Sequence, residues 1–252
     1  MIPLLMPSWP PGVRGVFTTR AGGQSIPPYA ELNLATHVGD DARTVAANRV
    51  LVAAAVGLSP EQLVFMDQVH GNDVAVVDGP VAVPPVADAL VTSAPGLALV
   101  VLVADCVPVL MADPYAGVVA AAHAGRKGVE SGVVAQALRV MQDLGAEPGR
   151  VRVQLGPSIN GCCYEVPESM QREVAAAAPG AVAGTGRTRA GTPSLDLRPG
   201  LAEQFAALGV RDVGLTGGCT HDDPDFFSYR RDGVTGRFAG LIWREPDPAS
   251  RT

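Results

Sequence analysis

The sequence predicts a single α/β domain, and three observations support this class. The chain has 252 residues, of which 47% are hydrophobic and 17% charged, as in ordinary globular proteins. Three strongly apolar runs follow one another over 97–125, and such runs are typical of strands buried on both faces. Segments with helical spacing lie before and after these runs. We find no internal repeat and no linker, so the expected domain spans residues 1–252.

The first half of the chain contains most of the expected strands. Residues 13–20 form a strand that ends at a glycine turn, and a loop follows. Helical spacing over 41–56 predicts a helix with Asp40 or Asp41 as its N-cap and Gly57 at its end. The other expected elements are strands at 63–71, 73–78, 97–105, 107–114 and 117–125, with a proline-rich loop at 81–88.

The second half alternates helices and strands. Helical spacing over 127–144 predicts one helix, which ends before a glycine. The next expected elements are a strand at 150–157, a helix at 166–180, an exposed loop at 184–193, a helix at 198–208 and a strand at 212–218. Residues 221–243 close the chain as a polar loop with aromatic side chains. Within it, Arg230 and Arg231 are best explained by a charged hairpin turn.

Charge and composition narrow the classes of function. The net charge of −6 argues against nucleic acid as a partner. The N-terminal apolar residues have no preceding Lys or Arg and are interrupted by prolines, unlike a signal peptide. The most apolar stretch, 97–112, is too short to span a membrane and contains Asp105. We therefore expect a cytoplasmic protein that binds no membrane. Its cysteines are then expected to be reduced.

Histidines and a thiol at strand ends are the candidate chemistry. His70 follows one expected strand, His123 ends another, and His221 comes just after a third, while Cys106 also lies at a strand end. Loops at strand ends are free to vary while the sheet holds them, so sites gather there. One thiolate and two imidazoles would make a zinc site with an open position for water or substrate. Taken singly, each of these residues more often has a structural role than a role in a metal site. A buried cysteine, for example, usually packs as a small hydrophobic residue.

A glycine-rich turn leads from a strand into a helix at 123–128, HAGRKG. Such a turn can bind an anion through its backbone N–H groups, and Arg126 and Lys127 add positive charge. Alternatively, the glycines only permit the turn and the cations are solvated. Arg20, beside paired glycines, has a similar setting.

A set of short motifs runs through the chain in a characteristic order. They are FTTRAGGQS, NLATHVGDD, QVHG, ADALVT, VADCVPVL, AHAG, GPSINGCCYEV, LDLR and CTHDDPDFFSYRRDGVTGRFAGLIW. In this order they resemble the YfiH-like family, also labelled the multicopper polyphenol oxidase or laccase-domain family. The resemblance covers about 16–243, nearly the whole chain.

The resemblance implies a fold, an activity and a metal. The implied fold is a layered α/β/β/α arrangement with mixed sheets. Members are described as purine nucleoside phosphorylases that cleave adenosine, inosine, guanosine and S-methyl-5′-thioadenosine with phosphate to base and ribose 1-phosphate. Some also deaminate adenosine. The implied metal is a single zinc, with copper as the alternative, held by His70 in QVHG, Cys106 in ADC and His123 in AHAG.

The resemblance also implies further site residues. Arg20 in FTTR is the first candidate for a catalytic contact with phosphate. Asn33, Gln68 and Arg126 are expected, with Arg20, to bind substrate. Asp105 either orients the metal site or accepts hydrogen bonds from backbone.

This chain departs from the pattern of the family at one point. Many members have His-Ala-Gly-Trp-Arg-Gly where this chain has Arg126 and Lys127 in place of the Trp-Arg pair. The positive charge is kept, but an aromatic surface is lost, and Arg and Lys are not equivalent at a bidentate anion site. No role is assigned to the remaining thiols, Cys162, Cys163 and Cys219.

Three other functions compete with phosphorolysis. A multicopper laccase needs more imidazoles than the four histidines of this chain supply. A hydrolase that edits peptidoglycan precursors would use Cys106 as nucleophile and His123 or His70 as base. A metal-holding partner protein that acts in cell division would turn over no nucleoside. The expected ligands are purine nucleosides and phosphate, and both a monomer and a homodimer stay open.

Overall fold

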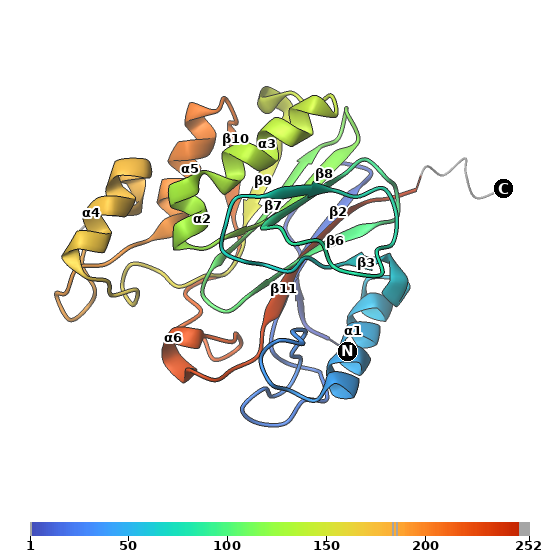
Figure 1. The fold of residues 1–252 in the computed structure, drawn as a ribbon, viewed down its shortest axis with the longest axis horizontal. Helices are drawn as coiled ribbons and strands as arrows, with labels where there is room; N and C mark the ends of the chain where they lie inside the picture. Colours follow the sequence, from blue (N-terminus) through green and yellow to red (C-terminus); the bar gives the residue numbers. More distant parts are fainter. Residues whose placement is uncertain (1, 183, 185, 247–252) are drawn as a thin grey trace.

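Two mixed sheets form the centre of the protein in the computed structural model, which describes residues 2–182, 184 and 186–246 (Figure 1). The five-stranded sheet contains β1 (Leu4–Leu5), β2 (Val13–Thr18), β3 (Leu63–Val64), β6 (Ala98–Val103) and β11 (Phe238–Arg244) in the order β1-β2-β11-β6-β3. The six-stranded sheet contains β4 (Val74–Val76), β5 (Ala89–Thr92), β7 (Val107–Asp113), β8 (Val118–Ala124), β9 (Arg152–Leu155) and β10 (Asp212–Leu215) in the order β10-β9-β7-β8-β5-β4.

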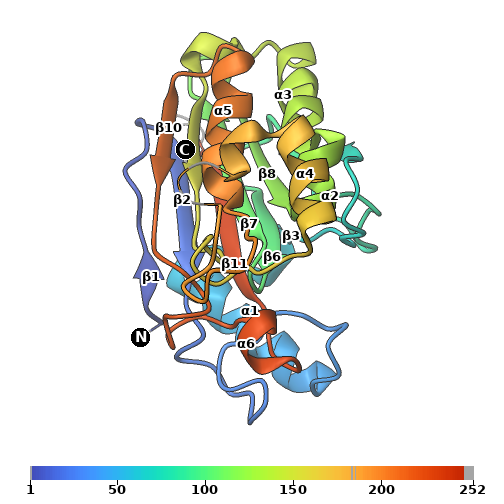
Figure 2. The ribbon, with the colours of Figure 1, turned by 90° about the vertical axis from the view of Figure 1, so that its left-hand side faces the viewer.

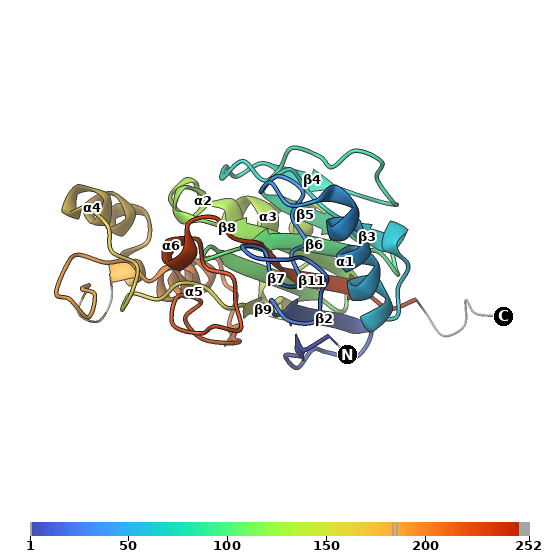
Figure 3. The ribbon, with the colours of Figure 1, turned by 90° about the horizontal axis from the view of Figure 1, so that it is seen from below.

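Helices cover the outer faces of the two sheets. The helix α1 (Ala42–Ala55) packs on the five-stranded sheet. The outer face of the six-stranded sheet is covered by α2 (Arg126–Ser131), α3 (Val133–Asp143) and α5 (Leu197–Ala207), and α4 (Glu168–Ala177) packs against α2 at the end of this layer. Figure 2 shows α3, α4 and α5 toward the opposite end of the view from α1, and Figure 3 shows α4 beyond the strands. The predicted α/β/β/α layering in a single domain is confirmed.

The apolar runs are explained by burial on both faces of a strand. In β6, Leu99 and Val101 lie in the core between the two sheets, whereas Val100 and Leu102 lie in the core beneath α1. In β8, Ala121 lies between the sheets and its neighbours face the helices. No face of these strands meets water, so the polar positions of an ordinary amphipathic strand are missing.

Several predicted elements are confirmed with shifted ends. Asp41 is the N-cap of α1, because its carboxylate accepts a hydrogen bond from Thr44 N at 2.8 Å. The strands predicted at 97–105, 107–114 and 117–125 are β6, β7 and β8. Within the described residues, no helix is long and apolar enough to cross a lipid bilayer.

Other predictions are wrong in extent. The strand predicted at 63–71 is β3, which has two residues, and the chain then runs as a loop to β4. The strand β5 was not predicted, because it is short and joins directly to the proline-rich loop. The helix predicted at 127–144 is broken into α2 and α3 at Gly132, whose φ of 79° is left-handed.

The C-terminal segment differs most from its prediction as a polar loop. It contains α6 (Tyr229–Asp232), so Arg230 and Arg231 lie in a short helix and not in a hairpin turn. It also contains β11, which pairs with β2 on one side and β6 on the other. The last strand of the chain thus fills the middle of the five-stranded sheet.

Candidate active site

Asp105 and Cys106 lie where the chain passes from one sheet to the other. β6 belongs to the five-stranded sheet and β7 to the six-stranded sheet. Asp105 has a φ of 93°, which an L-residue rarely adopts. Its carboxylate accepts hydrogen bonds from Thr220 Oγ1 and from Arg230 N, both at 2.7 Å. Asp105 is therefore an acid bonded to backbone and hydroxyl, and it anchors the passage to α6.

The structure brings His70, Cys106 and His123 together. One ligand atom from each lies within 4.8 Å of the others. The two imidazole rings meet edge to face with centroids 4.6 Å apart. Cys106 directly precedes β7 and His123 lies within the C-terminal part of β8, whereas His70 lies in the loop after β3 with a φ of 62°. These three side chains could hold a metal ion.

Asp88, to which the sequence interpretation assigned no role, organises this group. It is fully buried, and one oxygen accepts hydrogen bonds from His123 Nδ1 at 2.8 Å and His70 N at 3.0 Å. The other oxygen accepts from Gly71 N at 2.6 Å and Val69 N at 3.2 Å. Because Nδ1 of His123 faces Asp88, its Nε2 is left for the centre of the site. The signal in the sequence is an acid placed between the proline-rich loop and an apolar run.

The Cys106 thiol and the His123 imidazole change each other's protonation, and His70 adds to the effect on the thiol. Burial alone raises the pKa of Cys106, but His123 and His70 outweigh it and lower the pKa to about 6. Burial alone lowers the pKa of His123, but the Cys106 thiolate and Asp88 outweigh it and raise the pKa to about 9. At neutral pH the chain without metal therefore holds a thiolate beside an imidazolium. A thiolate is the form that binds a metal or attacks an electrophile.

A cavity of about 400 Å³ opens on these three residues. Its volume is in the range of small-molecule sites. Its other walls combine an apolar and aromatic part with three arginines. They are formed by His37, Gln68, Leu102, Val103, Ala104, Asp105, Arg126, Ile159, Tyr164, Leu197, Tyr229, Arg230 and Arg237.

Two of the predicted substrate-binding residues, Gln68 and Arg126, line this cavity. The amide of Gln68 bonds the backbone of Leu102 in both directions, at 2.8 and 2.9 Å. Arg126 begins α2, and its guanidinium donates to both oxygens of Glu130 at 2.9 Å. Lys127 is exposed and is not among the described residues that line the cavity.

The other two predicted residues, Arg20 and Asn33, are outside the described residues that line the cavity. Arg20 Nε donates to Ala30 O at 2.7 Å, and its guanidinium lies over the ring of Phe227. Asn33 is fully buried, and its oxygen accepts from Arg237 N at 2.9 Å. Asn33 therefore contacts the backbone of Arg237, whose side chain lines the cavity.

Three cavity residues of the C-terminal segment were not predicted as site residues: Tyr229, Arg230 and Arg237. The guanidinium of Arg230 lies 5.0 Å from the ring centroid of Tyr164 and donates to Glu165 O at 2.7 Å. The signal in the sequence is the alternation of aromatic residues and arginines before the last strand.

Residues 14–245 match the family described as "Multi-copper polyphenol oxidoreductase laccase". The chain belongs to this family. This confirms the laccase-domain resemblance seen in the motifs. Our chain, a member of this laccase family, has four histidines. Among the residues that the structure describes, one possible metal-binding group combines imidazoles with a thiol.

Relatives in the laccase family carry the name of an enzyme. The chain is 52% identical over 234 residues to "Purine nucleoside phosphorylase" of Corynebacterium glutamicum, covering 92% of this chain and 94% of that protein. It is 55% identical over 229 residues to another protein of that name from Streptomyces coelicolor, covering 90% and 93%. The crystal structure of a Neisseria meningitidis protein of the DUF152 family superposes with a TM-score of 0.86 at 35% identity, covering 96% of this chain and 99% of that one.

Proposed function

We propose that this chain is a purine nucleoside phosphorylase that works in the cavity beside His70, Cys106 and His123. The observation that carries the proposal is this cavity, which joins a metal-binding group, apolar and aromatic walls and three arginines. The names of the relatives support the same reaction. A phosphate oxygen would bond to the ribose C1′ as the C1′–N9 bond to the purine breaks and the base takes up a proton from phosphate or water, so the products would be the free base and ribose 1-phosphate.

We propose zinc as the ion of this site, held by the two imidazoles and the thiolate. Three protein ligands with an open fourth position are typical of catalytic zinc. Gly125 keeps the space open, because a Cβ there would lie 3.1 Å from both Cys106 Sγ and His70 Cδ2. The same donors also suit copper, which stays the alternative. When bound, the ion would supply a Lewis acid beside the substrate.

We assign one part of the remaining cavity wall to the nucleoside and another part to phosphate. Tyr164, Tyr229 and Ile159 offer an apolar surface for a purine ring. Arg126, Arg230 and Arg237 offer positive charge for phosphate. We propose adenosine, inosine, guanosine and S-methyl-5′-thioadenosine as the nucleosides. Deamination of adenosine in the same cavity is a second proposed activity.

Arg20 remains our candidate for phosphate from outside the wall of the cavity. Its Nε is bonded to Ala30 O, so a contact with phosphate requires its other guanidinium nitrogens or a shift of this loop. The variant Arg20→Ala should raise the KM for phosphate and leave the zinc content unchanged. Arg14→Ala is the matched control, because Arg14 is a surface residue paired with Glu245.

The test is adenosine turnover by chromatography on protein of known zinc content, with and without phosphate. Adenine that forms only with phosphate supports the phosphorylase. Inosine that forms regardless of phosphate points to deamination. The variants His70→Ala, Cys106→Ala and His123→Ala should each lose the zinc of this site and turnover together. An inactive His123→Ala protein that binds as much zinc as the wild type would overturn the assignment of the ligands.

One observation favours a second candidate, a cysteine hydrolase of peptidoglycan precursors. The lowered pKa of Cys106 beside His123 and His70 also fits a nucleophile with its base. A cysteine hydrolase needs no metal, so activity that survives chelation and ends on alkylation of Cys106 would support it. Zinc binding without any turnover would instead support a partner protein.

A further inference from the structure

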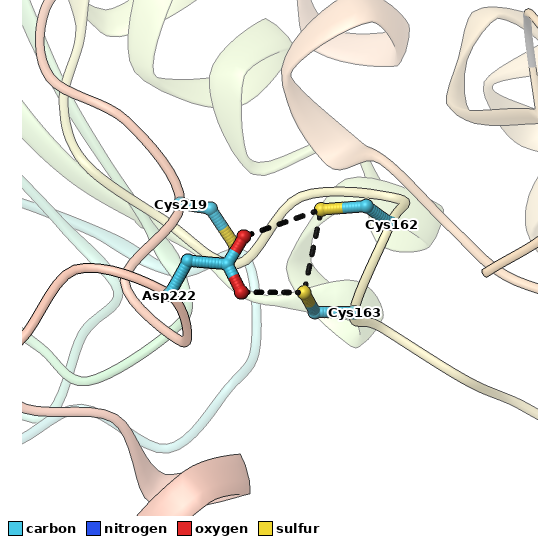
Figure 4. A group of neighbouring side chains, drawn as sticks. All are labelled: Cys162, Cys163, Cys219 and Asp222. Carbon is cyan, nitrogen blue, oxygen red and sulfur yellow. Dashed lines mark hydrogen bonds between the residues drawn. The ribbon is translucent and has the colours of Figure 1, made fainter. Parts of the chain in front are cut away.

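Three thiols and a carboxylate form a second cluster outside the cavity. Cys162 and Cys163 are adjacent in the loop after β9, and Cys219 and Asp222 lie in the loop after β10. Figure 4 shows the four side chains turned toward one another. One ligand atom from each lies within 4.8 Å of all the others. None of them is among the described residues that line the cavity.

We infer that this cluster is a second metal site, which takes a thiophilic divalent ion of the zinc class. The distances among Cys162, Cys163 and Asp222 lie within about 0.5 Å of those in a tetrahedral site. Cys162 Sγ lies 3.3 Å from Cys163 Sγ, and the oxygens of Asp222 lie 3.3 Å from Cys163 Sγ and 3.8 Å from Cys162 Sγ. With zinc–sulfur bonds of about 2.3 Å, a tetrahedral ion separates two sulfurs by about 3.8 Å and a sulfur and an oxygen by about 3.6 Å.

The sheet places these ligands before any ion binds. β9 and β10 are parallel neighbours, so the loops after them leave the same edge of the sheet. The loops are bonded to each other, because Thr220 N donates to Ser158 O at 3.0 Å. Cys219 is 8% exposed, and its sulfur accepts a hydrogen bond from Asn160 N at 3.4 Å. An amide that donates to sulfur stabilises the thiolate that a metal needs.

Arg189 offsets part of the negative charge of the cluster. Its guanidinium donates to the carboxylate of Asp222, with one bond of 2.9 Å, and lies 3.5 Å from Cys162 Sγ and 3.7 Å from Cys163 Sγ. Three thiolates and a carboxylate exceed the charge of one divalent ion, so a cation beside them is favourable. Asp222 can bind the ion through one oxygen and keep Arg189 on the other.

Thiolate sulfur selects the class of ion. Soft thiolates favour zinc or monovalent copper over magnesium, calcium and manganese. A disulfide between Cys162 and Cys163 is the competing fate of the cluster, but adjacent cysteines are poorly placed to pair. An ion here would tie the loop after β9 to the loop after β10. The first of these loops contains Ile159 and Tyr164, so the ion would also fix a wall of the cavity.

The test uses the full chain with the first site disabled by Cys106→Ala. This protein should bind about one equivalent of zinc, and its cobalt form should show the charge-transfer band of several thiolates. Adding Cys162→Ser and Cys163→Ser should abolish both signals. Asp222→Asn should weaken zinc binding, whereas Asp143→Asn, an exposed acid in α3, should not. Retention of the zinc equivalent by the serine variant would overturn the inference.

A second measurement needs no variant at the cluster. Zinc should protect Cys162, Cys163 and Cys219 from alkylation in the full chain, and a chelator should restore the reaction, as peptide mass spectrometry can follow. Equal alkylation with and without zinc would overturn the inference, even if the serine variant fails to fold. A disulfide between Cys162 and Cys163 in protein purified under reducing conditions would also overturn it. Neither readout depends on nucleoside turnover, so failure here is distinguishable from failure of the proposed function.

Discussion

The replacement Asp88→Asn tests how the first site is organised. Each oxygen of Asp88 accepts two N–H donors: His123 Nδ1 and His70 N on one, Gly71 N and Val69 N on the other. Asparagine keeps the shape but turns one oxygen into an NH₂ group. Two of the four donors therefore lose their acceptor, whichever way the amide is turned.

The magnitude follows from these lost acceptors. A buried donor left without an acceptor costs about 1–3 kcal/mol, so two cost about 2–6 kcal/mol of folding free energy. If the NH₂ group faces His123, it donates to Nδ1 and favours the tautomer with the proton on Nε2. The protonated Nε2 then cannot bind an ion. Removing such a partner of a ligating histidine typically lowers metal affinity by about 10–100-fold.

Asp113→Asn is the matched control. Asp113 is also fully buried, and it accepts hydrogen bonds from the backbone amides of Tyr115, Ala116 and Glu147 at 2.9, 3.1 and 2.9 Å. Both variants should lose stability in denaturant unfolding, but only Asp88→Asn should lose zinc affinity in competition with a chromophoric chelator. Zinc binding equal to wild type in Asp88→Asn would refute the orienting role.

Three further outcomes are expected. Gly125→Ala should reduce zinc binding, because its Cβ would lie 3.1 Å from two ligand side chains, whereas Gly149→Ala, with open space around it, should not; zinc titration checks both. Leu110→Ala, in the core between the sheets, should cost about 2–5 kcal/mol in urea unfolding, and Val83→Ala, which is 80% exposed, less than about 0.5 kcal/mol. The pKa of Asp41 is lowered mainly by the backbone amide three residues later, so its contribution to stability is present above pH 3.8 and disappears as the pH falls through the lowered pKa. The difference in Tm between wild type and Asp41→Ala should therefore shrink between pH 7 and pH 2, and a constant difference would contradict this.

Local patterns predicted the elements whose cause is local. The apolar runs of β6, β7 and β8 and the cap at Asp41 depend on neighbours within a few residues. The break at Gly132 was missed, because helical spacing continues across it and only the left-handed φ separates α2 from α3. The strand β11 was missed because its partners, β2 and β6, are distant in the sequence.

The candidate site shows the same division. The motifs identified His70, Cys106 and His123 as a group, and the structure places them together. Asp88 could not be assigned from the sequence, because its role consists of hydrogen bonds to residues 17 to 35 positions away. Arg20, predicted from its motif to bind phosphate, donates a hydrogen bond to the backbone of Ala30 and is not among the described residues that line the cavity, so its role stays a prediction.

Three features follow from the residue pattern alone: apolar strands buried on both faces, a helix capped by Asp40 or Asp41, and thiol and imidazole groups that can bind a metal. The packing of the chain places β6 and β7 in different sheets, with Cys106 at the passage between them. It also lets parallel β9 and β10 bring three thiols to one edge. The two kinds of feature differ because the interactions behind them act over different distances along the chain. Strand and helix preferences act between near neighbours, whereas a site forms only when packing brings together groups that the chain holds far apart.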